Sequence, residues 1–343
     1  MTTGRRFTKR SLWAAAVVLA GSLTACVNNG PQDALKPAGP DARKLDTLFK
    51  PVFWIAVVVF VLVEGLVLYC VIRFKARSDD DAPVQVHGNF RAELGWTIAP
   101  AILLLVVGVF TIKTIFDVNR VPKGADVVQV DVTGHRWWWE YQYPGIGVTT
   151  ANELHIPVGR PVAITLTSGD VIHNFWPPRL AGKVYAIPGR HNHMALQADK
   201  PGVYYGQCAE YCGASHANMR LRVVAMSATD WDTWVRDQKA GPATSASTTT
   251  STDPAAQGAA LFLSKGCAGC HAISGFAAGN VGPNLTHLQS RDCFAGCLFD
   301  MNDQNLRRWL RNPPGEKPGS VMPNLNLSET EITQLIAYLD TLK

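Results

Sequence analysis

The chain has 343 residues, enough for two or three compact units. Its formal net charge of +5 is modest and is not concentrated in a basic patch, so the composition does not indicate a nucleic-acid-binding protein. Its eight cysteines fall into local groups, which argues against the spread-out disulfide framework of a small secreted scaffold.

The N-terminus has the features of an export signal. An apolar run from Leu12 to Leu23 follows a group of basic residues, which is the order found in secretory signals: Arg5, Arg6, Lys9 and Arg10. The run ends in L-T-A-C, which resembles a bacterial lipobox and implies cleavage after residue 25 and attachment of lipid to Cys26. An uncleaved signal anchor is the alternative.

Two longer apolar runs follow, from Pro51 to Ile72 and from Thr97 to Phe116, and each matches the roughly 20 residues that cross a bilayer core. Under the positive-inside rule the segment between them lies in the cytoplasm, because it is rich in basic residues: Arg73, Lys75, Arg77 and Arg91. Both outer flanks then lie outside the cell. We therefore predict an external segment at 26–50, transmembrane helices at 51–73 and 97–117, and a cytoplasmic loop at 74–96.

The first predicted span contains one acidic residue, Glu64. An unpaired charge is costly inside a bilayer. We therefore expect Glu64 to face protein and to be protonated or paired there.

The external region from 118 to 240 has the texture of an all-β domain. Val127 to Val132 and Ala163 to Thr167 alternate between apolar and polar residues, as half-buried strands do. Frequent Gly and Pro residues separate such short segments, which favours a β-sandwich or barrel. A Ser/Thr-rich stretch at 241–254 follows and is too polar to pack, so it is predicted to be a linker.

Near the end of the β region, Cys208 to Met219 reads C-A-E-Y-C-G-A-S-H-A-N-M, a cluster of metal-ligand types in twelve residues. Thiolate and thioether sulfur favour copper, whereas a structural zinc site has no use for the thioether of Met219. His173 lies 35 residues before Cys208, after a strand-like run. The alternative is a Cys208–Cys212 disulfide beside a surface histidine and a core methionine.

The last segment, 255–343, is predicted to be helical. Asp303 to Arg311 and Ser328 to Leu342 read as helices, and Ser328 with Glu331 forms a plausible capping box.

Within this segment the run C-A-G-C-H from Cys267 to His271 is the attachment signal for c-type haem. In a cytosolic protein the same run would also fit a thioredoxin-like pair or half a zinc site. Met322, in a Met-Pro sequence, is the preferred sixth ligand, and Met301 is its rival. A thioether in that position raises the haem potential and suits electron transfer. Cys293 and Cys297 either close a small disulfide or stay unpaired.

These features together resemble subunit II of the haem–copper cytochrome c oxidases, in the bacterial form with a fused cytochrome c. The resemblance rests on the two spans, the motif H…C-x-E-x-C-x-x-x-H-x-x-M and the C-x-x-C-H signal, and it covers nearly the whole chain. It implies a multidomain fold: a two-helix transmembrane hairpin, a Greek-key cupredoxin head with a binuclear copper centre (CuA), and an all-α class I cytochrome c domain.

The resemblance also implies ligands. Cys208 and Cys212 would bridge two coppers, and His173 and His216 would each bind one copper. Met219 and the carbonyl of Glu210 would complete the set. The Glu210 side chain would face a magnesium or manganese ion at the contact with subunit I, with an exposed spacer as the alternative.

An aromatic run from Gly134 to Tyr141, G-H-R-W-W-W-E-Y, is similar to the family's segment below the copper site. Trp137 matches the tryptophan at which electrons enter, and Trp138 stands where a tyrosine is usual. The alternative for all three tryptophans is that they fill the sheet core or its contact with subunit I. Glu93 resembles the mouth of a proton channel, or is a headgroup-level carboxylate without a role.

The expected function is to pass electrons from haem c through CuA to subunit I, which reduces O2 and translocates protons. The expected partners are subunit I, other oxidase subunits, the membrane, and cytochrome c or a cytochrome bc complex as donor. The expected location is the bacterial plasma membrane, as a multi-pass protein with both cofactor domains on the outer face. Alternatives are a CuA-containing subunit of a nitric oxide reductase and a free-standing membrane-anchored carrier. Quinol-oxidase subunits resemble the hairpin but lack the copper ligands.

Overall fold

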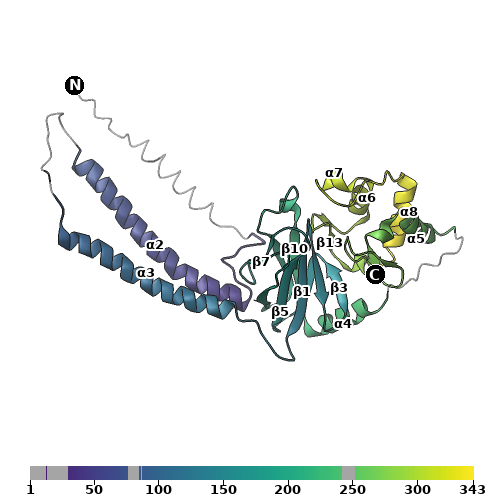
Figure 1. The fold of residues 1–343 in the computed structure, drawn as a ribbon, viewed down its shortest axis with the longest axis horizontal. Coiled ribbons are helices and arrows are strands. Elements are labelled where there is room, and N and C mark those ends of the chain that lie inside the picture. The colour runs from purple at the N-terminus through teal and green to yellow at the C-terminus, as the bar shows by residue number, and fades with distance from the viewer. Residues whose placement is uncertain (1–12, 14–29, 76–84, 86, 242–251) are drawn as a thin grey trace, which may run out of the picture.

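A computed structural model describes residues 13, 30–75, 85, 87–241 and 252–343. A pair of long helices, a β domain and a mainly helical C-terminal domain follow one another along the molecule (Figure 1). The C-terminal domain lies on the side of the β domain away from most of the helix pair. Cys26 and most of the Ser/Thr-rich stretch lie outside the described residues.

Both long helices extend beyond the predicted spans. Helix α2 is Pro40–Arg73 and α3 is Phe90–Val118, and both are long and apolar enough to cross a membrane. Helix α2 begins eleven residues before the predicted span at 51–73. Hydropathy detects only the apolar part of a helix. The first turns of α2 are polar, begin with Pro40 and pack on the β domain.

That polar first part of α2 contacts the β domain directly. The amide of Ala42 donates to the carbonyl of Leu180 at 3.2 Å, and Arg43 pairs with Asp199. The first membrane helix is thus joined to the domain that it anchors.

Helix α3 begins with a side-chain cap. Asn89 accepts a hydrogen bond from the amide of Ala92, and the Glu93 carboxylate accepts one from the amide of Asn89 at 3.2 Å. Glu93 therefore has a local capping role at the helix start.

The β domain is a sandwich of two five-stranded sheets, with orders β3-β2-β1-β5-β8 and β4-β10-β9-β6-β7. The strands are β1 Val128–His135, β2 Trp138–Tyr143, β3 Val148–Ala151, β4 Glu153–Pro157, β5 Val162–Ser168, β6 His173–Trp176, β7 Val184–Ala186, β8 Asn192–Leu196, β9 Gly202–Cys208 and β10 Arg220–Met226. The two predicted strands lie largely within β1 and β5, which pair in parallel. Alternate residues of both sheets form one buried core that includes Val132, Trp139, Leu166 and Phe175.

Helix α4, Ala228–Lys239, closes one end of the sandwich. Its Trp231 and Trp234 are buried against Tyr143, with ring centroids 6.1 and 5.4 Å away.

The C-terminal domain has a second core and four helices: α5 Pro254–Ser264, α6 Asp303–Arg311, α7 Pro313–Glu316 and α8 Glu329–Leu339. The capping box of Ser328 and Glu331 is confirmed, although α8 ends three residues before the predicted Leu342. The domain is not strictly all-α, because it also contains two short pairs of strands: β11 Ala272–Ile273 with β12 Ala277–Ala278, and β13 Cys293–Phe294 with β14 Phe299–Asp300.

Candidate copper and haem sites

The structure brings five predicted donor side chains together at one end of the sandwich. The Cys208 and Cys212 sulfurs are 3.8 Å apart. Nδ1 of His173 lies 3.9 Å from the Cys208 sulfur, and Nδ1 of His216 lies 3.5 Å from that of Cys212. The Met219 sulfur lies 3.9 Å from the Cys212 sulfur and is fully buried.

Local structure explains this convergence. Cys208 ends β9, His173 begins β6, and the two strands are neighbours in one sheet. The loop after β9 then turns back through a 3-10 turn, His216–Asn218, so that Met219 reaches the same point before β10 begins. The amide of Cys208 donates to the carbonyl of Met219 at 2.9 Å and closes the loop.

The sixth predicted donor is the backbone carbonyl of Glu210, 3.3 Å from the Cys208 sulfur. The Glu210 residue itself is half-buried. It is thus neither a freely exposed spacer nor part of the core.

The two cysteines are free thiols in the structure, so the alternative of a disulfide between them is not formed. The pKa of Cys208 is lowered, because the thiol of Cys212 and the ring of His173 hydrogen-bond its thiolate. The pKa of Cys212 is raised, because it keeps the proton that it shares with Cys208. One thiolate is therefore ready for a soft cation, which displaces the remaining proton on binding.

Asp170 is a residue of the candidate copper site that the sequence analysis missed. Its carboxylate lies 2.8 Å from Nε2 of His173 and accepts amide hydrogen bonds from Arg136 and Val171. This contact fixes the ring so that Nδ1 faces Cys208, as carboxylates do for metal-binding histidines. Its spacing of three residues before His173 was a signal available in the sequence.

Of the three consecutive tryptophans, Trp137 is the one bonded to the copper-site loop. All three are buried, and Nε1 of Trp137 donates to the carbonyl of Cys212 at 3.1 Å. Trp139 packs edge-on against Phe175 in the core, and Trp138 stacks on His135 at 4.4 Å. Packing alone therefore accounts for Trp138 and Trp139. Trp137 is also hydrogen-bonded to the loop that carries Cys212.

In the C-terminal domain, His271 is oriented for use as a ligand. Its Nδ1 lies 2.8 Å from the carbonyl of Pro283 and donates to it, which leaves Nε2 for a metal. Gly282 lies so close that a Cβ there would be 2.6 Å from the imidazole. Burial lowers the pKa of His271, which favours the neutral, ligating form.

An apolar cavity adjoins this histidine. Its lining includes one of the two candidate attachment cysteines, the histidine and Met322, together with apolar residues: Cys267, His271, Met322, Phe262, Leu285, Leu310, Pro323, Leu325, Leu327, Leu335 and Leu339. The second candidate attachment residue, Cys270, is exposed and does not line it. Met301 does not line it, so the structure favours Met322. A hydrophobic wall with one imidazole and one thioether fits a haem with two axial ligands.

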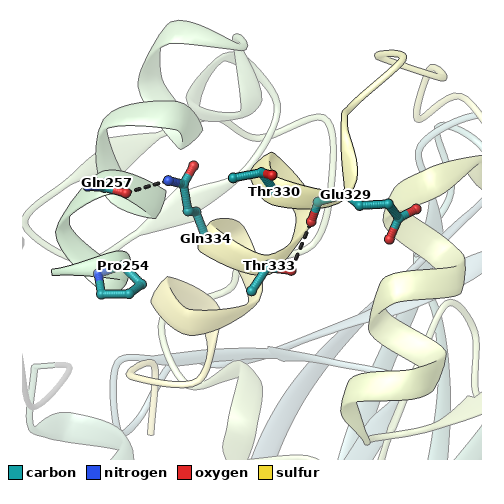
Figure 2. A pocket seen from close by; sticks show the side chains of 6 residues that line it. All are labelled: Pro254, Gln257, Glu329, Thr330, Thr333 and Gln334. Carbon is teal, nitrogen blue, oxygen red and sulfur yellow. Dashed lines mark hydrogen bonds between the residues drawn. The ribbon is translucent and has the colours of Figure 1, made fainter. Parts of the chain in front are cut away.

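A second depression of about 400 Å³ lies elsewhere on this domain. It is lined by Pro254 and five polar side chains near the starts of α5 and α8, as Figure 2 shows: Gln257, Glu329, Thr330, Thr333 and Gln334. None of the candidate copper or haem ligands lines it.

The two domains meet at the copper-site loop. Ser215 Oγ donates to the carbonyl of Pro318 at 2.7 Å, and a Cβ on Gly319 would lie 2.5 Å from the Trp137 ring. Trp137 is only 6% exposed as a result of its position between the loop and the C-terminal domain. The segment that covers it leads in three residues from Gly319 to Met322.

Comparisons with known proteins agree with this arrangement. Three family models match: the transmembrane domain of cytochrome c oxidase subunit II over 28–114, its periplasmic domain over 147–226, and cytochrome c over 255–343. Cytochrome c oxidase subunit 2 of Alkalihalophilus pseudofirmus is 39% identical over 330 residues, covering 94% of each chain. Quinol oxidase subunit 2 of Bacillus cereus is 31% identical over 236 residues, covering 67% of this chain and 81% of the relative.

Among solved structures, the periplasmic domain of cytochrome oxidase subunit II (CoxB) of Bradyrhizobium japonicum is 32% identical. The match covers 35% of this chain and 97% of the solved chain, with a TM-score of 0.34.

Fold, sites and relatives define a membrane-anchored electron-transfer subunit with a cupredoxin-like head and a cytochrome c domain. Its two domain types imply copper and haem as cofactors, and the Cys/His group of the head suits the first of these. The chain belongs to the cytochrome c oxidase subunit 2 family and serves as the electron-transfer subunit of that enzyme, in partnership with subunit I.

Proposed function

We propose that this chain receives electrons at a haem in its C-terminal domain and passes them through a two-copper centre to subunit I. The haem would be attached to Cys267 and Cys270 and ligated by His271 and Met322. The copper ligands would be His173, Cys208, the Glu210 carbonyl, Cys212, His216 and Met219.

The observation that carries this proposal is the convergence of two thiol sulfurs, two imidazoles and a thioether, each within 4 Å of a neighbouring donor. Such a soft, sulfur-rich set selects copper. Two coppers held by Cys208 and Cys212 would supply a site that stores one electron. The protein holds the donors in place through Asp170 and the Cys208–Met219 backbone bond, and it keeps water away by burying both cysteines.

Trp137 is proposed to be the point at which electrons enter the copper domain, and the donor is the chain's own haem domain. Its ring contacts Gly319 on one side, and its Nε1–H bonds the carbonyl of the ligand Cys212 on the other. Because the haem domain covers it, a separate cytochrome c would not reach Trp137 in this arrangement. An external donor, cytochrome c or a cytochrome bc complex, would therefore reduce the tethered haem.

The remaining roles follow from the family. Glu210 would contribute its side chain to a magnesium or manganese site facing subunit I, and Glu93 would mark a proton-channel entrance in addition to its capping bond. Both helices would cross the bacterial plasma membrane, with lipid on Cys26 as a further anchor. The copper and haem domains would lie on the outer face.

The test is electron paramagnetic resonance and absorption spectroscopy of the purified chain, with Cys208→Ser as the matched variant. The wild type should show low-spin haem c and a mixed-valence signal from one unpaired electron shared by two coppers. The variant should keep the haem and lose the shared signal. An isolated cupric ion in the wild type would contradict the proposal.

A further inference from the structure

The disulfide loop of the haem domain docks against the copper domain. Cys293 and Cys297 are bonded, and the three residues Ala295, Gly296 and Cys297 all have positive φ, at 52°, 73° and 52°. This backbone presents two carbonyls. That of Gly296 accepts from the amide of Arg220, beside Met219, at 2.9 Å.

The other carbonyl, of Ala295, is held by a buried lysine. Lys317 is 3% exposed, and its Nζ donates to the carbonyls of Ala295 and Trp137, both at 2.6 Å. One ammonium group thus joins the disulfide loop to the copper domain. Burial also lowers the pKa of Lys317 to about 7.

Two glycines allow the domains to approach this closely. A Cβ on Gly296 would lie 2.5 Å from the Trp137 carbonyl oxygen and 2.8 Å from that of Asn218. A Cβ on Gly319 would lie 2.5 Å from the Trp137 ring. Both residues have positive φ, so glycine at each position satisfies both the close approach and the left-handed backbone conformation.

We propose that the loop 293–297, Lys317 and Gly319 form a latch that fixes the haem domain over Trp137, so that electrons cross from a docked pose. The alternative is a domain that swings on its linker and docks anew for each transfer. The inference rests on the proposed function for the direction of transfer. In each transfer the haem iron loses one electron and the copper pair gains one, with no bond made or broken. Lys317 is a positioning residue here.

The kinetic test is laser-flash reduction of the haem in the full oxidase complex, followed by the rate of copper reduction. Lys317→Met leaves two buried carbonyls without a donor, which should lower the docked population and the transfer rate by about tenfold. Gly319→Ala should slow transfer by pushing the ring away. Gly275→Ala is the matched control, because Gly275 also has positive φ but has open space around it. Lys343→Met controls for loss of a lysine.

A second measurement needs neither cofactor turnover nor a partner. Hydrogen exchange of the Arg220 amide reports docking directly, because its acceptor is Gly296 in the other domain. In the copper-free chain, Lys317→Met and Gly319→Ala should speed exchange at Arg220, again by about tenfold, and the two controls should not. In the wild-type complex, the transfer rate should not depend on solvent viscosity.

The outcomes separate the two proposals. A wild-type complex without a two-copper signal or without haem-to-copper transfer overturns the proposed function. A wild type that transfers electrons, with Lys317→Met and Gly319→Ala unchanged in both rate and exchange, overturns the latch alone. Equal slowing by Gly275→Ala and Gly319→Ala, or a rate that falls with viscosity, also overturns it.

Discussion

The indole Nε1 of Trp137 donates a hydrogen bond to the backbone carbonyl of Cys212 at 3.1 Å. The bond links an aromatic ring covered by the haem domain to a residue of the copper-ligand loop, 75 positions away in sequence. The bond positions the loop, and under the proposed function the ring would also offer electrons a path across the domain boundary.

Trp137→Phe should affect both stability and electron transfer. It keeps an aromatic ring but leaves the Cys212 carbonyl buried without its donor, which should destabilise the copper domain by about 1–3 kcal/mol. Haem-to-copper transfer should slow, whereas the haem spectrum should not change. The measurements are the flash-induced transfer rate and thermal unfolding.

Trp234→Phe is the control, because Trp234 is buried at the α4 end of the same domain and packs on Tyr143 and His155. If both variants transfer electrons at the same rate, Trp137 is only a packing residue.

Asp170→Asn should weaken copper binding. The carboxylate is 2.8 Å from Nε2 of His173, and losing such a partner of a metal-binding histidine typically costs 10–100-fold, so about that loss of affinity is expected. Competition with a copper chelator measures it. Asp126→Asn changes an exposed carboxylate of the same domain and should leave affinity unchanged; a similar loss there would argue for a general charge effect.

Local patterns explain which features the sequence could predict. Five of the six candidate copper ligands, the haem signal and the Ser328–Glu331 capping box each lie within a short segment, whereas His173 lies 35 residues before Cys208. The structure confirms the capping box and brings the candidate copper-donor side chains together. The start of α2 at Pro40 was missed, because its first turns are stabilised by contacts with the β domain and not by apolar residues.

The domain contact is a different case. Lys317 bonds the carbonyl of Trp137 across 180 residues, and nothing near Lys317 in the sequence indicates burial. Because lysine is normally exposed, the residue type predicts an exposed side chain at this position, whereas Lys317 is buried. Only the fold shows which two backbone carbonyls satisfy it.

Met322→Leu and Met301→Leu should distinguish the axial ligand. Met322 lines the cavity beside His271, whereas Met301 is half-buried outside that lining. Removing the Met322 thioether should lower the midpoint potential of the haem, because Met/His ligation raises it. Redox titration of the haem absorption band measures this, and the reverse pattern, with the larger change in Met301→Leu, would reassign the ligand.

The last prediction concerns a buried carboxylate at the same domain boundary. Glu153 is 1% exposed, and its oxygens accept the amide of Asp292 in the haem domain at 3.0 and 3.1 Å. Arg222 lies 3.8 Å away and Arg291 is also near. Burial outweighs these favourable contacts and raises the pKa of Glu153 from 4.5 to about 7.

A raised pKa means that the folded chain binds the proton more tightly than the unfolded chain. The stabilisation is fully present below pH 4.5 and is lost as the pH rises through about 7, and it amounts to at most about 3 kcal/mol. Glu153→Gln stays neutral and can still accept from the Asp292 amide. The variant should therefore gain stability relative to wild type as the pH rises from 4.5 to 7, and the gain should level off above that range.

Thermal unfolding of the full chain at several pH values measures this difference. Glu140→Gln is the control, since Glu140 is a half-buried carboxylate on β2 of the same domain. The control should follow the wild-type pH dependence. A Glu153→Gln curve parallel to wild type across this range would show that Glu153 is already ionised in the folded chain, held by Arg222 and Arg291 in spite of its burial.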